Sequence, residues 1–117
     1  MIIIRLMGGL GNQMFQYAFG KRVAFERKVP LKLDLSWFAQ QEKRKYQLDQ
    51  FTLQVEFASE EEVYRTRYFS HNRIIRKFFF FYQKFLPYWR RSFIRENDVN
   101  VFDQKYLNVP RNCVLEG

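Results

Sequence analysis

Residues 7–18 of this chain read MGGLGNQMFQYA, a segment with three glycines near the start of the chain. The apolar run from Ile2 to Leu6 precedes it, and a segment with helix-like spacing of apolar residues follows it. This order predicts a buried strand, a glycine-rich turn and a helix. Glycine adopts positive φ without strain, and the free N–H groups at the start of a helix carry a partial positive charge that suits phosphate. We therefore expect a ligand-binding loop.

Two familiar phosphate-loop patterns fail when they are tested against this loop. Counted from Gly9, the third glycine of G-x-G-x-x-G falls on Met14, and no Gly-Lys-Ser/Thr follows that could build a Walker A loop. Asp34, at the end of the next apolar run, is the one feature shared with a dinucleotide site. A dinucleotide-binding Rossmann domain remains an alternative, which titration with NAD or FAD would test.

Alternating helical and strand-like segments continue along the chain. A helix is predicted over Gln13 to Arg27, with an apolar face that carries Phe15, Ala18, Phe19 and Val23. Strands are predicted over Leu31 to Leu35 and Ser92 to Ile94, a short helix after an N-cap at Ser59, and a further strand from Cys113. Such alternation is typical of a parallel sheet covered by helices. The sequence therefore predicts the α/β class.

The glycine-rich stretch also carries a family resemblance. Residues 8–18, GGLGNQMFQYA, resemble letter for letter the N-terminal signature of the bacterial α-1,2-fucosyltransferases, glycosyltransferase family 11. LKLDLSWF at residues 31–38 is similar to the family's second strand, and RKYQLDQF at residues 44–51 to its R-x-Y-x-L-D-x-F segment. VLEG at residues 114–117 resembles a later strand, and the similarity is least distinctive in residues 64–95.

This resemblance implies an enzyme with two Rossmann-like domains that face a cleft, the glycosyltransferase B arrangement, of which residues 1–117 would be part of the N-terminal domain. The complete enzyme would transfer L-fucose from GDP-fucose to O2 of a terminal galactose with inversion, in the synthesis of surface polysaccharide or lipopolysaccharide. Its partners would be GDP-fucose and a galactose-terminated glycan. No cofactor or metal is expected, and the sequence contains no D-x-D triplet.

The chain departs from the family at the donor-binding motif H-x-R-R-x-D. The one histidine, His71, is followed by Asn-Arg-Ile-Ile, so that Ile74 stands where the second arginine belongs. We expect that the chain stops before the donor-binding C-terminal domain, that it is inactive alone, and that its catalytic residues are unknown. An open reading frame beyond Gly117 that encodes the motif would indicate a truncated enzyme, and a genuine stop codon a non-catalytic remnant of a transferase.

The resemblance assigns substrate-binding roles only within the loop. Gly8, Gly9 and Gly11 would let the backbone turn tightly beside the cleft, while Asn12 and Gln13 would offer their amides to a sugar hydroxyl or a diphosphate oxygen. Structural alternatives exist for each: the glycines could serve close packing, Asn12 could cap a helix that begins at Gln13, and Gln13 could bridge two loops.

Asp34 is a secondary candidate, because open α/β sheets place ligand residues at the ends of their strands. An acid at this position can equally cap the turn through Ser36. Trp37 and Phe38 could stack on a sugar, although an aromatic residue after a strand more often joins the core.

The net charge of +8 is concentrated in one segment, since Tyr64 to Arg95 contains nine Lys or Arg and no acid. Apolar positions 74, 78, 81, 82 and 85 would share one face of a helix there, which Pro87 would end. Packing against a core or a partner domain is the first interpretation, and contact with an anionic membrane the second. Nucleic acid is not an expected partner, because the modular RNA-binding signatures are absent.

Composition limits the remaining possibilities. A chain of 117 residues suffices for one domain, and its hydrophobic fraction of 47% can supply a core. Cys113 is the one cysteine, so no internal disulfide forms. The sequence shows no signal-peptide pattern and no window with the roughly 20 apolar residues of a membrane span. We expect a cytoplasmic protein, with peripheral contact at the inner face of the cytoplasmic membrane as the other localisation.

Overall fold

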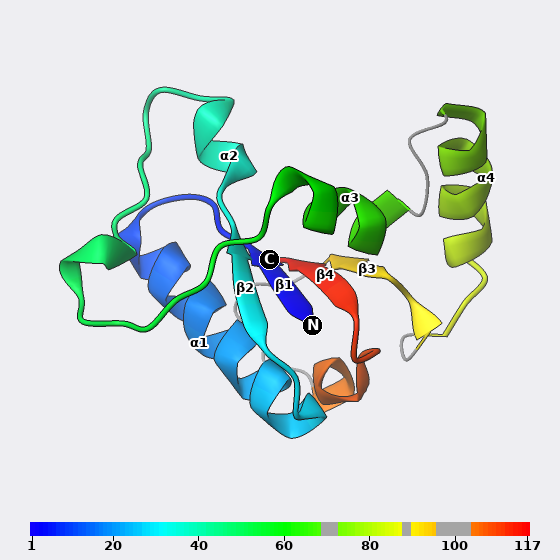
Figure 1. The fold of residues 1–117 in the computed structure, drawn as a ribbon, viewed down its shortest axis with the longest axis horizontal. Coiled ribbons are helices and arrows are strands. Elements are labelled where there is room, and N and C mark those ends of the chain that lie inside the picture. Colours follow the sequence, from blue (N-terminus) through cyan, green and yellow to red (C-terminus); the bar gives the residue numbers. More distant parts are fainter. Residues whose placement is uncertain (69–72, 88–89, 96–103) are drawn as a thin grey trace.

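A four-stranded parallel sheet forms the centre of the protein (Figure 1). The computed structural model describes residues 1–68, 73–87, 90–95 and 104–117. The strands are β1 (Ile2–Arg5), β2 (Leu31–Asp34), β3 (Phe93–Arg95) and β4 (Cys113–Glu116), and their order across the sheet is β2-β1-β4-β3. All three pairings are parallel. The predicted α/β fold, a parallel sheet flanked by helices and compatible with an incomplete Rossmann-like domain, is confirmed.

Helices lie on both sides of this sheet. They are α1 (Leu10–Arg27), α2 (Ser36–Ala39), α3 (Glu60–Tyr68) and α4 (Arg73–Gln83), with 3₁₀ turns at Leu48–Gln50 and Gln104–Asn108. Figure 1 shows α1 on one side of the sheet, α3 on the other, and α4 beyond the end of α3. The segment after α2 returns along the outer edge of β2, where the N–H of Leu33 donates to Glu56 O at 2.8 Å and so covers that edge.

The core lies between α1 and the sheet. Ile2 and Ile4 of β1 pack in one buried cluster with Phe19 and Val23 of α1. Ile3, which points to the opposite face, is also fully buried. Because β1 is covered on both faces, its sequence is a continuous apolar run, as in other buried parallel strands.

The predicted element boundaries are mostly close to the observed ones. Each predicted strand agrees to within one residue. Ser59 begins α3 with a capping box, since its Oγ accepts from the N–H of Glu62 at 3.1 Å and its own N–H donates to Glu62 Oε2 at 2.9 Å. The exception is α1, which begins at Leu10 rather than at the predicted Gln13.

The apolar face of α4 is exposed, whereas its first interpretation was packing against a core or a partner domain. A helix forms over Arg73–Gln83 and ends before Pro87, as predicted, but the apolar side chains at positions 74, 78, 81, 82 and 85 do not enter the core of the described residues. The exposed fractions are 66% for Ile74, 71% for Phe78, 62% for Phe81, 60% for Tyr82 and 73% for Phe85. Core packing within this part of the chain is therefore wrong for these residues, and packing against a partner domain stays a prediction.

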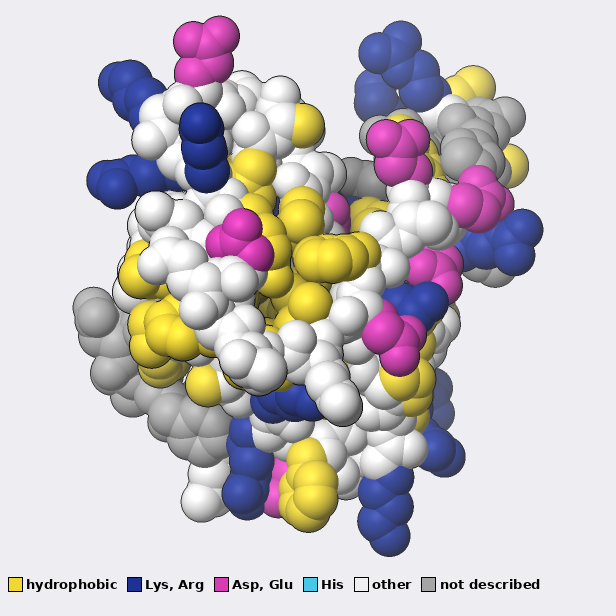
Figure 2. Space-filling model, turned by 60° about the vertical axis from the view of Figure 1, so that its left-hand side comes forward, with side chains coloured by type: hydrophobic (Ala, Val, Ile, Leu, Met, Phe, Trp, Pro, Cys, Tyr) yellow, Lys and Arg dark blue, Asp and Glu magenta, His cyan; other side chains and the backbone are white. Residues whose placement is uncertain are grey.

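A smaller hydrophobic surface lies on the side of the molecule that carries the 41–58 segment (Figure 2). Within this segment Phe57 is 50% exposed, and its ring meets that of Tyr46 edge-on at a centroid distance of 5.7 Å. Over the described ranges, none of the helices combines the length and the apolar character that a bilayer crossing requires.

Close contact between α1 and the sheet gives a testable prediction at Gly20. A Cβ there would lie 3.0 Å from Leu31 Cδ1 and 3.2 Å from Ile4 Cβ, whereas a Cβ at Gly11 would meet nothing within 4 Å. We expect Gly20→Val to lower the free energy of unfolding by about 1–3 kcal/mol through overpacking. Gly11→Val, on the same helix, is the control and should change stability little. Equal effects of the two substitutions in urea unfolding would contradict this packing.

Candidate functional site

The glycine loop joins the carboxyl end of β1 to the start of α1. Gly8 has φ of +78°, and a Cβ there would lie 2.6 Å from the Asn12 side-chain nitrogen, so that only glycine fits. A Cβ at Gly9 would lie 3.3 Å from Arg44 Nη1, while Gly11 faces open space. Gly8 therefore forms a left-handed turn, Gly9 lies close to a cation, and Gly11 lies at an accessible surface.

The start of α1 has the properties of an anion-binding site. The first intrahelical bond runs from the N–H of Gln13 to Gly9 O at 3.0 Å, so the N–H groups of the three preceding residues have no intrahelical acceptor. Gly9, at the N-cap position, supplies no side-chain cap, and no acid lies in the first turn. Asn12 is exposed and lies inside this turn, so its predicted role as the cap of a helix beginning at Gln13 is wrong.

Gln13 is fully buried and ties this loop to a second one. Its Nε2 donates to Gly8 O at 3.0 Å and to Lys45 O at 2.8 Å, and its Oε1 accepts from the N–H of Gln47 at 2.9 Å. The alternative that Gln13 bridges two loops is confirmed. Because both amide hydrogens are used in this bridge, direct contact between Gln13 and a ligand stays a prediction.

Gln16, which sequence reasoning missed, ties the loop to the end of β4. Its Oε1 accepts from the N–H of Met7 at 3.0 Å, and its Nε2 donates to Gly117 O at 2.9 Å. The predicted apolar face of α1 was wrong in part, because Phe15 is 43% exposed and the buried positions include Gln13 and Gln16. The signal in the sequence was the pair of glutamines three residues apart, which share one helix face.

A second group of polar residues lies at the same edge of the sheet, where β1, β2 and β4 end. Register places Arg5 between Asp34 and Glu116. The Arg5 Nη1 atom lies 3.2 Å from Glu116 Oε2, and Arg5 Nε lies 3.9 Å from Asp34 Oδ2. Glu116 also pairs with Arg67 at 3.8 Å and with Arg95 at 3.7 Å. The strand ends thus form a network of charges.

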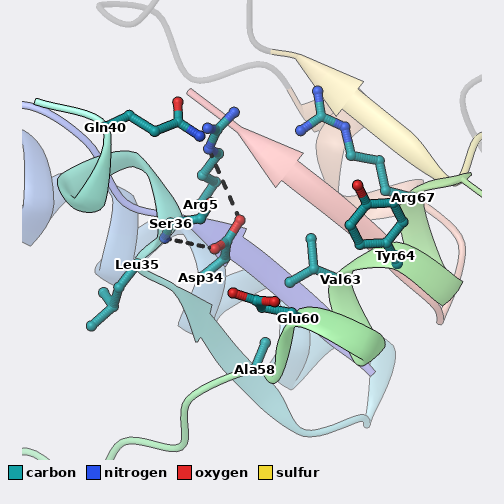
Figure 3. A pocket seen from close by; sticks show the side chains of 10 residues that line it. All are labelled: Arg5, Asp34, Leu35, Ser36, Gln40, Ala58, Glu60, Val63, Tyr64 and Arg67. Atoms are coloured by element: carbon teal, nitrogen blue, oxygen red, sulfur yellow. Dashed lines mark hydrogen bonds and ion pairs between the residues drawn. The ribbon is translucent and has the colours of Figure 1, made fainter.

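Asp34 and Arg5 line a cavity of about 500 Å³ on the α3 side of the sheet (Figure 3). Asp34 Oδ1 accepts from the N–H of Ser36 at 2.9 Å, which confirms the turn cap that was one interpretation of this acid. The opposite wall comes from α3, with Glu60 and Tyr64. Sequence reasoning selected Asp34 but not Arg5, although a cation that ends a strand of isoleucines was a usable signal.

The other candidates from the sequence are placed as follows. Phe38 packs against the core, and the Trp37 ring meets it edge-on at a centroid distance of 5.3 Å. Burial raises the pKa of Cys113 to about 12, so its thiol is protonated at neutral pH. His71 lies outside the described residues. Within the part of the chain that the structure describes, His, Cys, Asp and Glu form no group of three or more that could hold a metal ion.

Comparison with known proteins gives a short similarity. No family model and no solved structure matches the chain. A segment of 34 residues is 62% identical to an alpha-1,2-colitosyltransferase of Escherichia coli. The aligned segment covers 29% of this chain and 12% of that enzyme, so the match spans a small part of the relative. The similarity supports a relationship to glycosyltransferases and leaves the sugar specificity open.

The bridge made by Gln13 gives a testable prediction about loop stability. In Gln13→Ala the carbonyls of Gly8 and Lys45 and the N–H of Gln47 lose their partner. A buried polar group without a partner costs about 1–3 kcal/mol, so we expect the free energy of unfolding to fall by about 2 kcal/mol or more. The control is Gln50→Ala, at an exposed glutamine. Urea unfolding and hydrogen exchange at the Gln47 amide measure the effect, and a loss no larger than the control's would contradict the bridge.

Proposed function

We propose that this chain is the N-terminal, Rossmann-like part of a glycosyltransferase and that its glycine loop forms one wall of the sugar-nucleotide cleft. The observation that carries the proposal is the uncapped start of α1 directly after the left-handed turn at Gly8. The loop lies at the carboxyl end of β1, and the strands that follow in the sequence lie on opposite sides of β1, with β2 on one side and β4 on the other. Open α/β sheets bind ligands at such a switch point.

The loop suits a diphosphate on electrostatic grounds. Transfer of a sugar from a nucleotide leaves negative charge on the departing diphosphate, which backbone N–H groups and cations stabilise. The N–H groups of Leu10, Gly11 and Asn12 are available for this purpose, and Arg44 lies beside Gly9. Gln41 holds the backbone of this loop at Arg44, because its Oε1 accepts from the Arg44 backbone N–H at 2.7 Å. A cation is therefore placed next to the free helix terminus.

The reaction that we propose is transfer of L-fucose from GDP-fucose to O2 of a terminal galactose with inversion, in surface polysaccharide or lipopolysaccharide synthesis. The relative's name supports the α-1,2 linkage. The choice of fucose depends on the family resemblance of residues 8–18, since the relative is named for colitose. A C-terminal domain would supply the donor-binding arginines and the catalytic groups, so the chain alone is expected to bind without turnover.

Binding to the isolated chain tests this function. We expect GDP-fucose and GDP to shift the amide resonances of residues 8–13 in a ¹H–¹⁵N NMR titration. Asn12→Ala should weaken that binding about tenfold if its amide bonds to the diphosphate or the sugar, because a hydrogen bond to a charged group contributes about 1.5–3 kcal/mol. Asn112→Ala is the matched control, since this exposed asparagine precedes β4 and lies at the opposite edge of the sheet.

The same titration distinguishes the alternatives. Tighter binding of NAD than of GDP-fucose would favour the dinucleotide-binding domain. Absence of any shift in residues 8–13 with all three nucleotides would contradict a ligand role for the loop.

A second function, contact with a membrane surface, is favoured by the exposed apolar face of α4. We propose that α4 rests on an anionic bilayer, because exposed Arg73, Lys77 and Lys84 accompany its aromatic side chains and residues 64–95 contain no acid. Basic residues near such a surface contribute on the order of 1 kcal/mol each, and aromatic residues enter the interface.

Sedimentation with vesicles tests the membrane contact. The chain should sediment with phosphatidylserine-containing vesicles at low salt, and much less at high salt or with neutral vesicles. Phe78→Asp should reduce binding severalfold, whereas Phe25→Asp, at a residue that is 77% exposed on α1, should not. No sedimentation at low salt would rule out this function and would leave the face for a partner domain.

A further inference from the structure

We infer that the cavity beside α3 binds a sugar and that Arg5 Nε and Asp34 Oδ2 together hold one of its hydroxyl groups. This inference depends on the proposed function for the class of ligand, a carbohydrate. The cavity lies at the same edge of the sheet as the glycine loop but is formed by different residues. The cavity of about 500 Å³ is within the range of small-molecule sites.

Arg5 and Asp34 each carry a buried polar atom at this cavity. Asp34 is only 4% exposed, and among the described residues neither its Oδ2 nor Arg5 Nε has a hydrogen-bond partner. Buried polar atoms normally have such a partner, and an exception at a cavity wall indicates a group that is supplied from outside. Figure 3 shows the Asp34 carboxylate between the Arg5 guanidinium and the turn at Ser36, at the wall of the cavity.

The distance between these atoms selects the chemistry of the ligand. At 3.9 Å, Arg5 Nε and Asp34 Oδ2 are too far apart to bond to each other but close enough for one oxygen to reach both. A hydroxyl group meets both needs, since it accepts a hydrogen bond from Arg5 and donates one to Asp34. An anionic group would be repelled by Asp34, and a cationic group by Arg5. A neutral polyol such as a sugar therefore fits best.

The surroundings hold this pair rigidly and complete a sugar site. Arg5 is anchored by Glu116 at 3.2 Å, and Asp34 by the N–H of Ser36 at 2.9 Å, so neither side chain must be ordered by the ligand. Across the cavity, Glu60 offers further hydrogen-bond acceptors and Tyr64 an aromatic ring (Figure 3). Such a combination of carboxylates, a cation and an aromatic residue can recognise both the hydroxyl groups and the apolar face of a sugar ring.

The cavity adjoins the glycine loop along the chain. Arg5 ends β1 three residues before Gly8, and the N–H of Leu6 donates to Asp34 O at 3.0 Å. A sugar in the cavity and a diphosphate at the loop would thus occupy the same edge of the sheet. The sugar can be the terminal residue of the acceptor glycan or the sugar of the nucleotide donor, and the experiment distinguishes these sources.

The test is an NMR titration of the isolated chain with lactose, GDP and GDP-fucose. Shifts of Arg5, Asp34 and Tyr64 with lactose would support the inference and identify the acceptor. Shifts of these residues with GDP-fucose but not with GDP or lactose would support it and identify the donor sugar. If lactose has no effect and the two nucleotides act alike on these residues, the inference is overturned, even where GDP binding at residues 8–13 upholds the proposed function.

Sugar affinity in substituted chains is a second test of the inference. Asp34→Asn keeps an oxygen for the Ser36 N–H but presents an NH₂ group to the ligand, so sugar affinity should fall at least fivefold while GDP affinity is unchanged. Asp49→Asn is the matched control, because it makes the same chemical change at an exposed acid that does not line the cavity. Unchanged sugar affinity in Asp34→Asn would overturn the inference. If this variant fails to unfold cooperatively, the shift mapping of the original chain decides.

Discussion

Burial of β1 on both faces determines where this fold can carry polar groups. Its isoleucines are fully buried, and the strand pairs with β2 on one side and with β4 on the other. A strand covered on all sides can carry a charge only where it emerges, which is the position of Arg5. The glycine loop must follow at once, because α1 has to run back across the face of the sheet to reach β2. Burial of the strand thus places the cation and the loop at one edge.

Much of the fold could be predicted because its signals are local. Apolar runs marked the strands to within one residue, and Ser59 with its following glutamates marked the start of α3. The start of α1 was placed too late because Gly11 lowers helix propensity, which matters little in a first turn that has few intrahelical bonds. Its buried face was misjudged because Gln13 and Gln16 bond to residues 45–47 and 117, which are distant in sequence.

The candidate site also contains some residues that local sequence signals indicate and some contacts that only the fold creates. Gly8 could be recognised from sequence because a left-handed turn requires a particular residue, and Asp34 because acids at strand ends face ligands. The network around Glu116 could not be derived, since it depends on the order β2-β1-β4-β3, which places Arg5 against a residue 111 positions away. Only pairing between distant strands creates that contact. Residue type was therefore enough to select single positions such as Gly8 and Asp34, whereas the contact between Arg5 and Glu116 depends on the strand order of the sheet.

In the site that we propose, the two glutamines of α1 fix the glycine loop before a ligand binds. Gln13 and Gln16 use amides rather than charges, so they fix the loop without adding a field that would compete with a diphosphate. The ion pair of Arg5 and Asp34 lies instead on the α3 side, where the two charges offset each other beside the cavity. Helix N–H groups on one side suit an anion, and a balanced pair on the other suits a neutral hydroxyl. A nucleotide-linked sugar carries both kinds of group, and the division of charge across β1 corresponds to that chemistry.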